Sequence, residues 1–160
     1  MIEFTRSAYD DVVNHAYDGG DEERCGVLVG DSDPDRGDRG DRDGQRDRSV
    51  VTETYPTENA AERPRTRYLI DPEELFEIIE TVEASGHEVV GFYHSHPNGP
   101  PHPSETDAER ATWPDHSYVI CALDGQPFVG SWRWRGDDTT FEQETVAVGS
   151  AGMAGTPGRR

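Results

Sequence analysis

The sequence predicts one domain of mixed α/β (α+β) class, with a single sheet packed by a few helices. Its 160 residues are enough for one domain of ordinary size. Short β-rich runs outnumber helical patterns, and several of these runs follow one another closely enough to form hairpins. Only 32% of the residues are apolar, so part of the chain is expected to contribute nothing to the core.

The first half of the chain contains one weak helix and three β-rich runs. Alanine and valine recur at helical spacing over 7–17, which predicts a helix there. The runs 25–30, 49–55 and 67–70 are apolar or rich in β-branched and aromatic residues, so each is expected to be a strand.

The clearest helix is predicted over 71–85. Asp71 is placed to cap its N-terminus, Pro72 suits the first helical position, and Gly86 stops it. Apolar side chains recur at the i, i+3, i+4, i+7 spacing of one helix face: Leu75, Ile78, Ile79 and Val82. The helix is therefore expected to pack against the sheet. The remaining predicted elements are a strand over 88–96, a helix over 104–113, and strands over 118–123, 128–134 and 140–148.

The folded domain is expected to span 1–148, interrupted by an insert at 31–48. The insert has no apolar residue and consists mainly of seven Asp and five Arg with Gly, so it is expected to be disordered. The tail 149–160 is expected to be flexible. Because the insert carries a net charge of only −2, the rest of the chain carries −16 of the total of −18.

The charge and the cysteine count exclude several classes of protein. All 15 basic residues are Arg, against 33 acidic residues, so phosphate backbones and anionic membrane surfaces would repel the chain. No run approaches the ~20 apolar residues of a membrane span, and the N-terminus shows no signal peptide. Cys25 and Cys121 are too few for a disulfide framework. These features predict a cytoplasmic protein, and the acidity without Lys predicts a salt-rich, halophilic cytoplasm.

The segment most informative about chemistry is the end of the strand 88–96. His94 and His96 are two residues apart, so on a strand both side chains share one face and can bind one metal ion. A Pro-rich loop then leads to Ser104 and Asp107, and Asp107 can supply a third, oxygen ligand. Two simpler interpretations remain open. His-x-His pairs also occur at strand ends without a metal, and Ser104-x-x-Asp107 is a capping-box pattern. Capping and metal binding can also coexist.

Two other residues have simpler explanations. Cys25 lies in an apolar run and is expected to be a core residue rather than a nucleophile. His102 lies in the Pro-rich loop, where an exposed histidine is expected.

The pattern His94-Ser95-His96, seven residues, Ser104, two residues, Asp107 resembles the signature of the JAMM (MPN+) metalloproteases. An upstream piece fits the same family, because Glu23 precedes a Cys-Gly pair and an apolar strand. The resemblance covers roughly residues 2 to 135.

The resemblance implies a fold and a set of roles. The fold is a curved, mostly antiparallel sheet flanked by helices, similar to that of cytidine deaminases. One Zn²⁺ per chain would be bound by His94, His96 and Asp107, with a water in the fourth position. Glu23 would act as general base and then acid, and Ser104 would hydrogen-bond the oxyanion. The choice of Glu23 over its neighbour Glu22 rests on the family alignment alone.

The resemblance also implies a function. These enzymes hydrolyse isopeptide bonds between ubiquitin-like modifier proteins and Lys side chains. For this chain we expect removal of small archaeal ubiquitin-like modifiers after their Gly-Gly end, a desampylase-like activity, together with cleavage of linear fusions. Two alternatives remain: a JAMM hydrolase that processes the C-terminus of a sulfur-carrier protein, and a metal-free MPN scaffold that only binds partners. The oligomeric state is left open.

Overall fold

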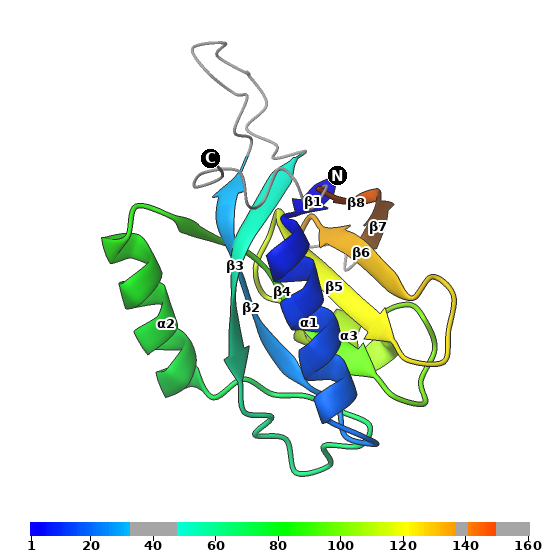
Figure 1. Cartoon of the computed structure of the whole chain (residues 1–160). Coiled ribbons are helices and arrows are strands. Elements are labelled where there is room, and N and C mark those ends of the chain that lie inside the picture. Colours follow the sequence, from blue (N-terminus) through cyan, green and yellow to red (C-terminus); the bar gives the residue numbers. More distant parts are fainter. Residues whose placement is uncertain (33–47, 137–140, 150–160) are drawn as a thin grey trace.

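The computed structural model describes residues 1–32, 48–136 and 141–149. Most of the predicted insert at 31–48 and of the predicted tail at 149–160 lies outside these ranges. The described elements are β1 (Ile2–Phe4), α1 (Arg6–Asp18), β2 (Cys25–Ser32), β3 (Ser49–Thr57), α2 (Pro72–Ala84), β4 (Glu88–His96), α3 (Glu105–Arg110), β5 (His116–Ala122), β6 (Val129–Trp134), β7 (Phe141–Glu144) and β8 (Val146–Val148) (Figure 1).

The described strands form one mixed sheet in the order β7-β6-β5-β4-β2-β3-β1-β8. Four neighbouring pairs are antiparallel, and the pairs β1–β3, β1–β8 and β4–β5 are parallel. The two edge strands, β7 and β8, are separated in sequence only by Thr145. The sheet therefore curls until its edges come together (Figure 1), which confirms the predicted α/β class with a curved, mostly antiparallel sheet.

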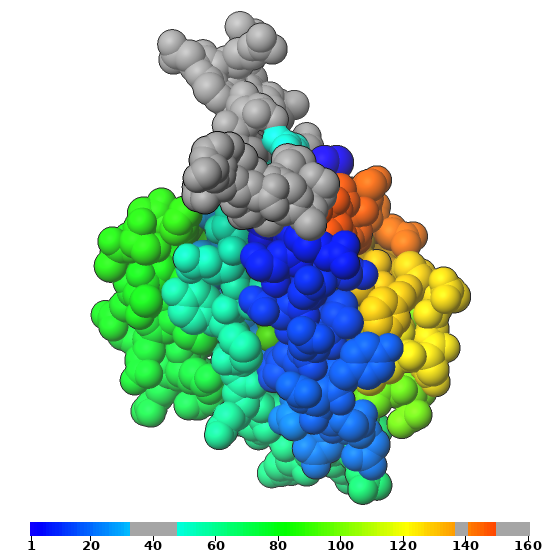
Figure 2. All heavy atoms as spheres, viewed as in Figure 1, coloured from blue at the N-terminus to red at the C-terminus, as the bar shows by residue number. Residues whose placement is uncertain are grey.

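Helices cover both faces of this sheet. Because neighbouring residues on a strand point to opposite faces, each central strand contributes side chains to both layers. On one face Tyr93 and Leu28 pack with the buried side of α1. On the other face Phe92 packs with Ile78 of α2 and with Ala111, which follows α3. Figure 2 shows α1 crossing the front of the molecule, with α2 at its left edge.

A β-bulge in β4 aligns the end of that strand for the site. Val90 is an extra residue with no paired position in β2, and such an insertion resets the alternation of the side chains. Beyond the bulge, the side chains of Phe92, His94 and His96 lie two residues apart. They therefore all point to the face that α2 and α3 cover.

The helix starts follow the sequence signals in part. Thr5 Oγ1 accepts a hydrogen bond from Ala8 N at 3.3 Å and caps α1. Asp71 occupies the N-cap position of α2 and Pro72 follows it, as predicted, but the Asp71 side chain makes no capping hydrogen bond. The preference of Pro for the first turn and the buried Ile78 therefore account for the start and position of this helix.

The predicted strand at 67–70 is wrong, since no strand forms there. The side chain of Asn59 binds this run instead. Its Nδ2 donates to Arg67 O at 2.9 Å, and its Oδ1 accepts from Leu69 N at 3.0 Å. A side-chain amide thus takes the backbone groups that a neighbouring strand would have paired.

The predicted helix at 104–113 is also too long, because α3 ends at Arg110. Pro114 disfavours a helical conformation at the residue before it. The amides of Thr112 and Trp113 each donate to Tyr118 Oη at 3.2 Å rather than to helix carbonyls. The hydroxyl of Tyr118 therefore fixes the chain where the helix was expected to continue.

Three smaller differences concern strands. β1, with Ile2 and Phe4 fully buried, was not predicted because three residues give too short a pattern. The predicted strand 140–148 is two strands, since the chain leaves one edge of the sheet and joins the other at Thr145. β2 extends to Ser32, into the range assigned to the insert. In the described ranges, no helix has the length and apolar content needed to cross a bilayer.

Candidate metal centre and active site

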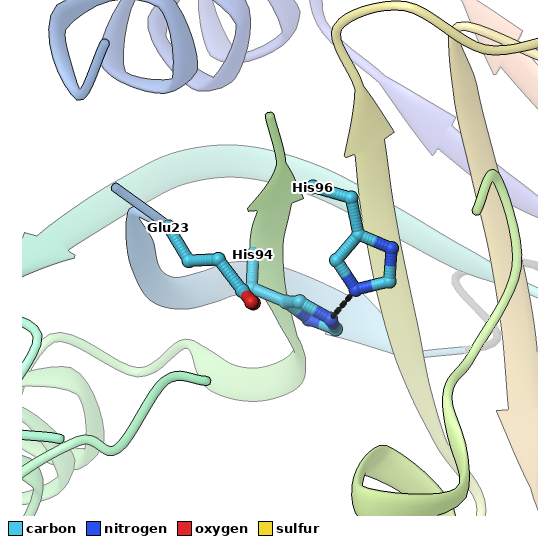
Figure 3. Close-up of side chains that lie close together, drawn as sticks. All are labelled: Glu23, His94 and His96. Carbon is cyan, nitrogen blue, oxygen red and sulfur yellow. Dashed lines mark hydrogen bonds between the residues drawn. The ribbon is translucent and has the colours of Figure 1, made fainter. Parts of the chain in front are cut away.

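The signature residues gather where β4 ends, beside the start of β2 and the first turn of α3. Cys25 pairs with His94 in the sheet, so the residues just before β2 lie beside the two histidines. The Glu23 carboxylate lies near the His94 ring, and His94 and His96 point toward one another (Figure 3). The sheet register thus brings together residues more than 70 positions apart in the sequence.

The two imidazoles face each other with their Nε2 atoms 3.0 Å apart. His96 Nδ1 lies 2.6 Å from Pro100 O, and a carbonyl oxygen only accepts, so Nδ1 carries the proton. The Nε2 of His96 therefore presents its lone pair to His94. This arrangement is satisfied by a proton on one of the two Nε2 atoms or by a metal ion bound to both. In metal sites a backbone carbonyl typically orients a ligating imidazole through its other ring nitrogen, as Pro100 O does for His96.

Asp107 completes a triangle with the two histidines. Its Oδ2 is 3.2 Å from His94 Nε2 and 3.4 Å from His96 Nε2. The same oxygen accepts a hydrogen bond from Ser104 N at 2.8 Å, and Asp107 N donates to Ser104 Oγ at 3.1 Å. The capping box and the convergence on the histidines thus coexist, and the cap holds the carboxylate in place.

These three atoms fit a metal ion. Ligands about 2.0–2.2 Å from a tetrahedral Zn²⁺ lie about 3.4 Å from one another, and the three separations here are 3.0, 3.2 and 3.4 Å. Two imidazoles with one carboxylate are also a typical donor set of a catalytic zinc site that keeps one open position. The donor set and its spacing agree with a metal site of this kind.

Glu23 borders this triangle. Its side chain is only 4% exposed, whereas the side chain of Glu22 is exposed. A carboxylate oxygen of Glu23 lies within 4.8 Å of the donor atoms of both histidines. Burial raises the pKa of Glu23 to about 7, so the side chain is suited to exchange protons near neutral pH. The structure thus distinguishes the two neighbouring glutamates, which the residue pattern alone left undecided.

Glu23 does not lie on a strand, since β2 begins at Cys25. Its backbone N donates to Pro64 O at 2.6 Å, and its carbonyl accepts from Asn59 Nδ2 at 2.9 Å. Next to it, Arg24 N donates to Ser95 Oγ at 2.8 Å, and Ser95 N donates to Arg24 O at 2.9 Å. The middle residue of His94-Ser95-His96 therefore joins the Glu23 segment to the histidine strand.

Two residues of the site were not predicted as such. Asn59 uses its whole amide, because it also accepts from Ala61 N at 3.0 Å in addition to its bonds with Glu23, Arg67 and Leu69. Tyr68 stacks on the His94 ring with centroids 4.2 Å apart and planes at 21°. No local pattern marks either residue, since both act through contacts that are distant in sequence.

The charges in the centre depend on one another. Burial by itself would raise the pKa of Asp107, but the neighbouring His94 and His96 hold that pKa far below its usual range. Burial lowers the pKa of His94. His96 is buried as well, yet its hydrogen bonds to Asp107 and Pro100 raise its pKa. The carboxylate is thus held ionised, as a metal ligand needs to be.

A pocket of about 240 Å³ opens beside the centre. Its wall includes Glu23, His96 and Ser104 together with Arg65, Thr66 and the loop from Pro97 to Pro100. The Ser104 hydroxyl accepts from Asp107 N, which leaves its own O–H free to donate. A substrate group in this pocket would therefore meet the carboxylate of Glu23, the imidazole of His96 and the hydroxyl of Ser104.

The structure agrees with the simpler explanations of Cys25 and His102. Burial raises the pKa of Cys25 to about 11, so it stays a thiol at neutral pH, and it is fully buried beside Thr57. Cys25 is thus a core residue, as expected. His102 is exposed.

The family described as prokaryotic homologs of the JAB domain matches residues 5–135. The chain belongs to this JAB (MPN) family. The match covers nearly the same range as the signature resemblance, which it confirms together with the expected fold.

Two curated proteins are similar to much of this chain. The desampylase of Haloferax volcanii is 41% identical over 151 residues, covering 92% of this chain and 96% of that protein. The CysO-cysteine peptidase of Mycobacterium tuberculosis is 35% identical over 109 residues, covering 68% of this chain and 64% of that protein. A solved protein from Desulfitobacterium hafniense superposes with a TM-score of 0.76 at 26% identity, covering 94% of each chain. The expected enzyme class, a JAB-type hydrolase, is thereby confirmed.

Proposed function

We propose that this chain is a zinc-dependent isopeptidase. It hydrolyses the bond between the C-terminal Gly-Gly of a small ubiquitin-like modifier and a Lys side chain, and it also cleaves linear fusions after the same end. The observation that carries this proposal is the triangle of His94, His96 and Asp107 donor atoms with Glu23 beside it and Ser104 on the pocket wall. Similarity to a desampylase over 92% of the chain supports the substrate class.

In this proposal each residue has a distinct role. His94, His96 and Asp107 would hold one Zn²⁺, which would supply Lewis acidity. Glu23 would take a proton from the attacking water and pass it to the leaving Lys amine. Ser104 donates its O–H to the oxygen that becomes negative, a contribution of about 3 kcal/mol for one such donor.

The pocket suits a slender substrate. Its wall between Pro97 and Pro100 contains Asn98 and Gly99, and a Cβ added at Gly99 would press on the His96 ring at 3.3 Å. A Gly-Gly tail brings no side chains of its own, so it passes such a wall without a clash. We infer that this loop favours the Gly-Gly end of a modifier over bulkier tails.

The test is hydrolysis of a purified modifier–Lys conjugate, with and without a chelator, alongside measurement of zinc content. His94→Ala and Asp107→Ala are expected to lose both zinc and activity, with His102→Ala as the matched control. Ser104→Ala keeps zinc but loses about 10²–10³-fold in kcat. Glu23→Gln keeps zinc and loses at least about 10²-fold, whereas Glu22→Gln behaves as the wild type.

Three results would contradict the proposal. Full activity in the presence of chelator would exclude metal catalysis, and full activity of Glu23→Gln would exclude the base. Purified protein without zinc and without hydrolysis of any conjugate would favour a binding scaffold.

A second substrate is favoured by the 35% identity to a CysO-cysteine peptidase. Here the same residues would release a C-terminal amino acid from a sulfur-carrier protein. Assays of a conjugated and a C-terminally extended carrier, side by side on the same enzyme, separate the two by their kcat/KM values.

A further inference from the structure

A second pocket, of about 590 Å³, lies on the segment between β3 and α2. Three arginines line it, together with four other residues: Arg63, Arg67, Arg110, Ala60, Ala61, Glu62 and Leu69. We call this the arginine pocket. It gathers three positive charges against one negative charge, on a chain whose net charge is −18.

The three arginines have no carboxylate partner among the described residues. Five of the other six described arginines form ion pairs within 4.0 Å: Arg6, Arg48, Arg65, Arg133 and Arg135. With acidic residues outnumbering basic ones by more than two to one, three unpaired guanidinium groups in one pocket point to an external anionic partner. Leu69 at the same pocket is 43% exposed, so the pocket combines positive charge with apolar surface, a composition typical of protein interfaces.

The arginine pocket and the active-site pocket are lined by neighbouring residues of the same segment, although they have no lining residue in common. The run 63–67 contributes Arg63 and Arg67 to the arginine pocket and Arg65 to the pocket beside Glu23. On the other side, α3 carries Arg110 one turn after Asp107. A molecule whose end occupies the active-site pocket would therefore place its adjoining surface over the arginines.

Hydrogen bonds hold Arg110 and the backbone of the 67–69 run in place without a partner. Arg110 Nη1 donates to Tyr68 O at 3.3 Å, and Asn59 holds the backbone on both sides of Tyr68. Groups fixed in advance lose less conformational entropy when a partner binds. Arg also presents a planar fork of donors that matches a carboxylate.

We propose that the arginine pocket docks an acidic patch on the folded body of the ubiquitin-like modifier, while the tail of that modifier enters the active-site pocket. This rests on the proposed function. An acidic modifier approaching a chain of charge −18 is repelled by most of its surface, and the arginine pocket supplies local attraction beside the reacting bond. High salt screens the long-range repulsion between exposed charges, whereas charge pairs that become partly buried on docking are screened much less.

The experiment compares two substrates at one fixed salt concentration. One is the folded modifier joined to a fluorogenic amine through its Gly-Gly end, and the other is a short peptide with the same end and amine. Arg63→Glu/Arg67→Glu is expected to raise KM for the folded modifier about tenfold and to leave kcat unchanged. The kcat and KM for the peptide should also stay unchanged. Arg63→Gln/Arg67→Gln gives a smaller rise in the same direction.

Arg67→Glu is matched by Arg6→Glu, which makes the same charge change on an exposed arginine of α1. Arg6→Glu is expected to change KM for either substrate by less than twofold, which excludes a general effect of net charge. Neutralising acidic residues on the modifier should raise KM for the wild type and remove the difference in KM between the wild type and Arg63→Glu/Arg67→Glu.

The outcomes are distinguishable. An unchanged KM of Arg63→Glu/Arg67→Glu for the folded modifier, with the peptide still cleaved, would overturn the docking proposal and leave the isopeptidase intact. An equal loss of kcat/KM on both substrates would show that the arginines act on the catalytic centre, and would also overturn the docking proposal. A wild type that cleaves neither substrate would overturn the proposed function, and this inference with it.

Discussion

Replacing Asn59 tests whether one side chain positions both Glu23, the proposed general base, and the Tyr68 ring that stacks on His94. Its amide makes four hydrogen bonds, donating to Glu23 O and Arg67 O and accepting from Ala61 N and Leu69 N. Asn59→Ala removes all four. The bonds to Glu23 and Ala61 are partly buried and the other two are exposed.

At a net of about 1 kcal/mol for each partly buried bond and less for each exposed one, the free energy of unfolding should fall by about 2–3 kcal/mol. The Glu23 segment and Tyr68 then lose their common anchor, and a displacement near 1 Å at the reacting groups costs up to about 10²-fold in rate. We therefore expect kcat to fall by one to two orders of magnitude. The content of the proposed zinc should be unchanged, because Asn59 bonds to none of His94, His96 and Asp107.

The assays are urea unfolding, metal content and steady-state kinetics on the peptide substrate. Asn59→Asp is the matched variant, since it keeps the two acceptor bonds and loses the two donors. It should retain the 59–69 turn but still lower kcat, because its carboxylate faces the Glu23 carbonyl. Wild-type kcat in both variants would refute the positioning role. Loss of zinc together with kcat would place the effect at the metal ligands instead.

Two predictions concern stability. Burial alone would raise the pKa of Glu144, but Arg133, Ser117 and the N-terminal amine hold it below its ordinary value of 4.5. Because the pKa is lower in the folded state, Glu144 stabilises the fold fully above the unfolded pKa and loses this effect as the pH falls through the folded one. Glu144→Gln should cost about 3 kcal/mol at pH 7 by leaving the Arg133 charge buried alone. The difference in the free energy of unfolding between Glu144→Gln and the wild type should shrink in thermal melts below pH 4.5. A difference that does not change with pH would contradict this prediction. Tyr93→Phe removes the 2.7 Å bond between Tyr93 Oη and His15 Nδ1, which joins β4 to α1, and should cost about 1 kcal/mol in urea unfolding. An unchanged midpoint would mean that water replaces this bond.

Elements with a long, periodic pattern were predictable from the sequence. The 3.6-residue repeat of Leu75, Ile78 and Val82 places α2 within one residue of its bounds, and β4 matches its prediction at both ends. The run 67–70 has strand-like residues, yet its backbone groups bind Asn59, and no local pattern indicates that contact. Short-range propensity fails where a distant side chain satisfies the backbone.

In the candidate site, too, some residues were readable from local pattern and others depended on contacts distant in sequence. The spacing of His94, His96 and Asp107 is readable, because a strand and a capped helix turn fix where those side chains point. The residue pattern alone does not separate Glu23 from Glu22; the family resemblance chose Glu23, and the burial of its side chain supports that choice. Tyr68 and Asn59 lie in an irregular segment, where nothing in the sequence gives the direction of a side chain.

The meeting of the two sheet edges has a consequence for how the chain folds. β1 pairs in parallel with β3 and also with β8, where Ile2 lies opposite Val146. The Glu144 cluster that joins this region uses Arg133 and the first residue of the chain. Contacts so distant in sequence slow folding, because a long loop must close before they form. We therefore expect the half built from α1 and β2–β5 to form first, and the seam between β1 and β8 to be the last part to close and the first to open.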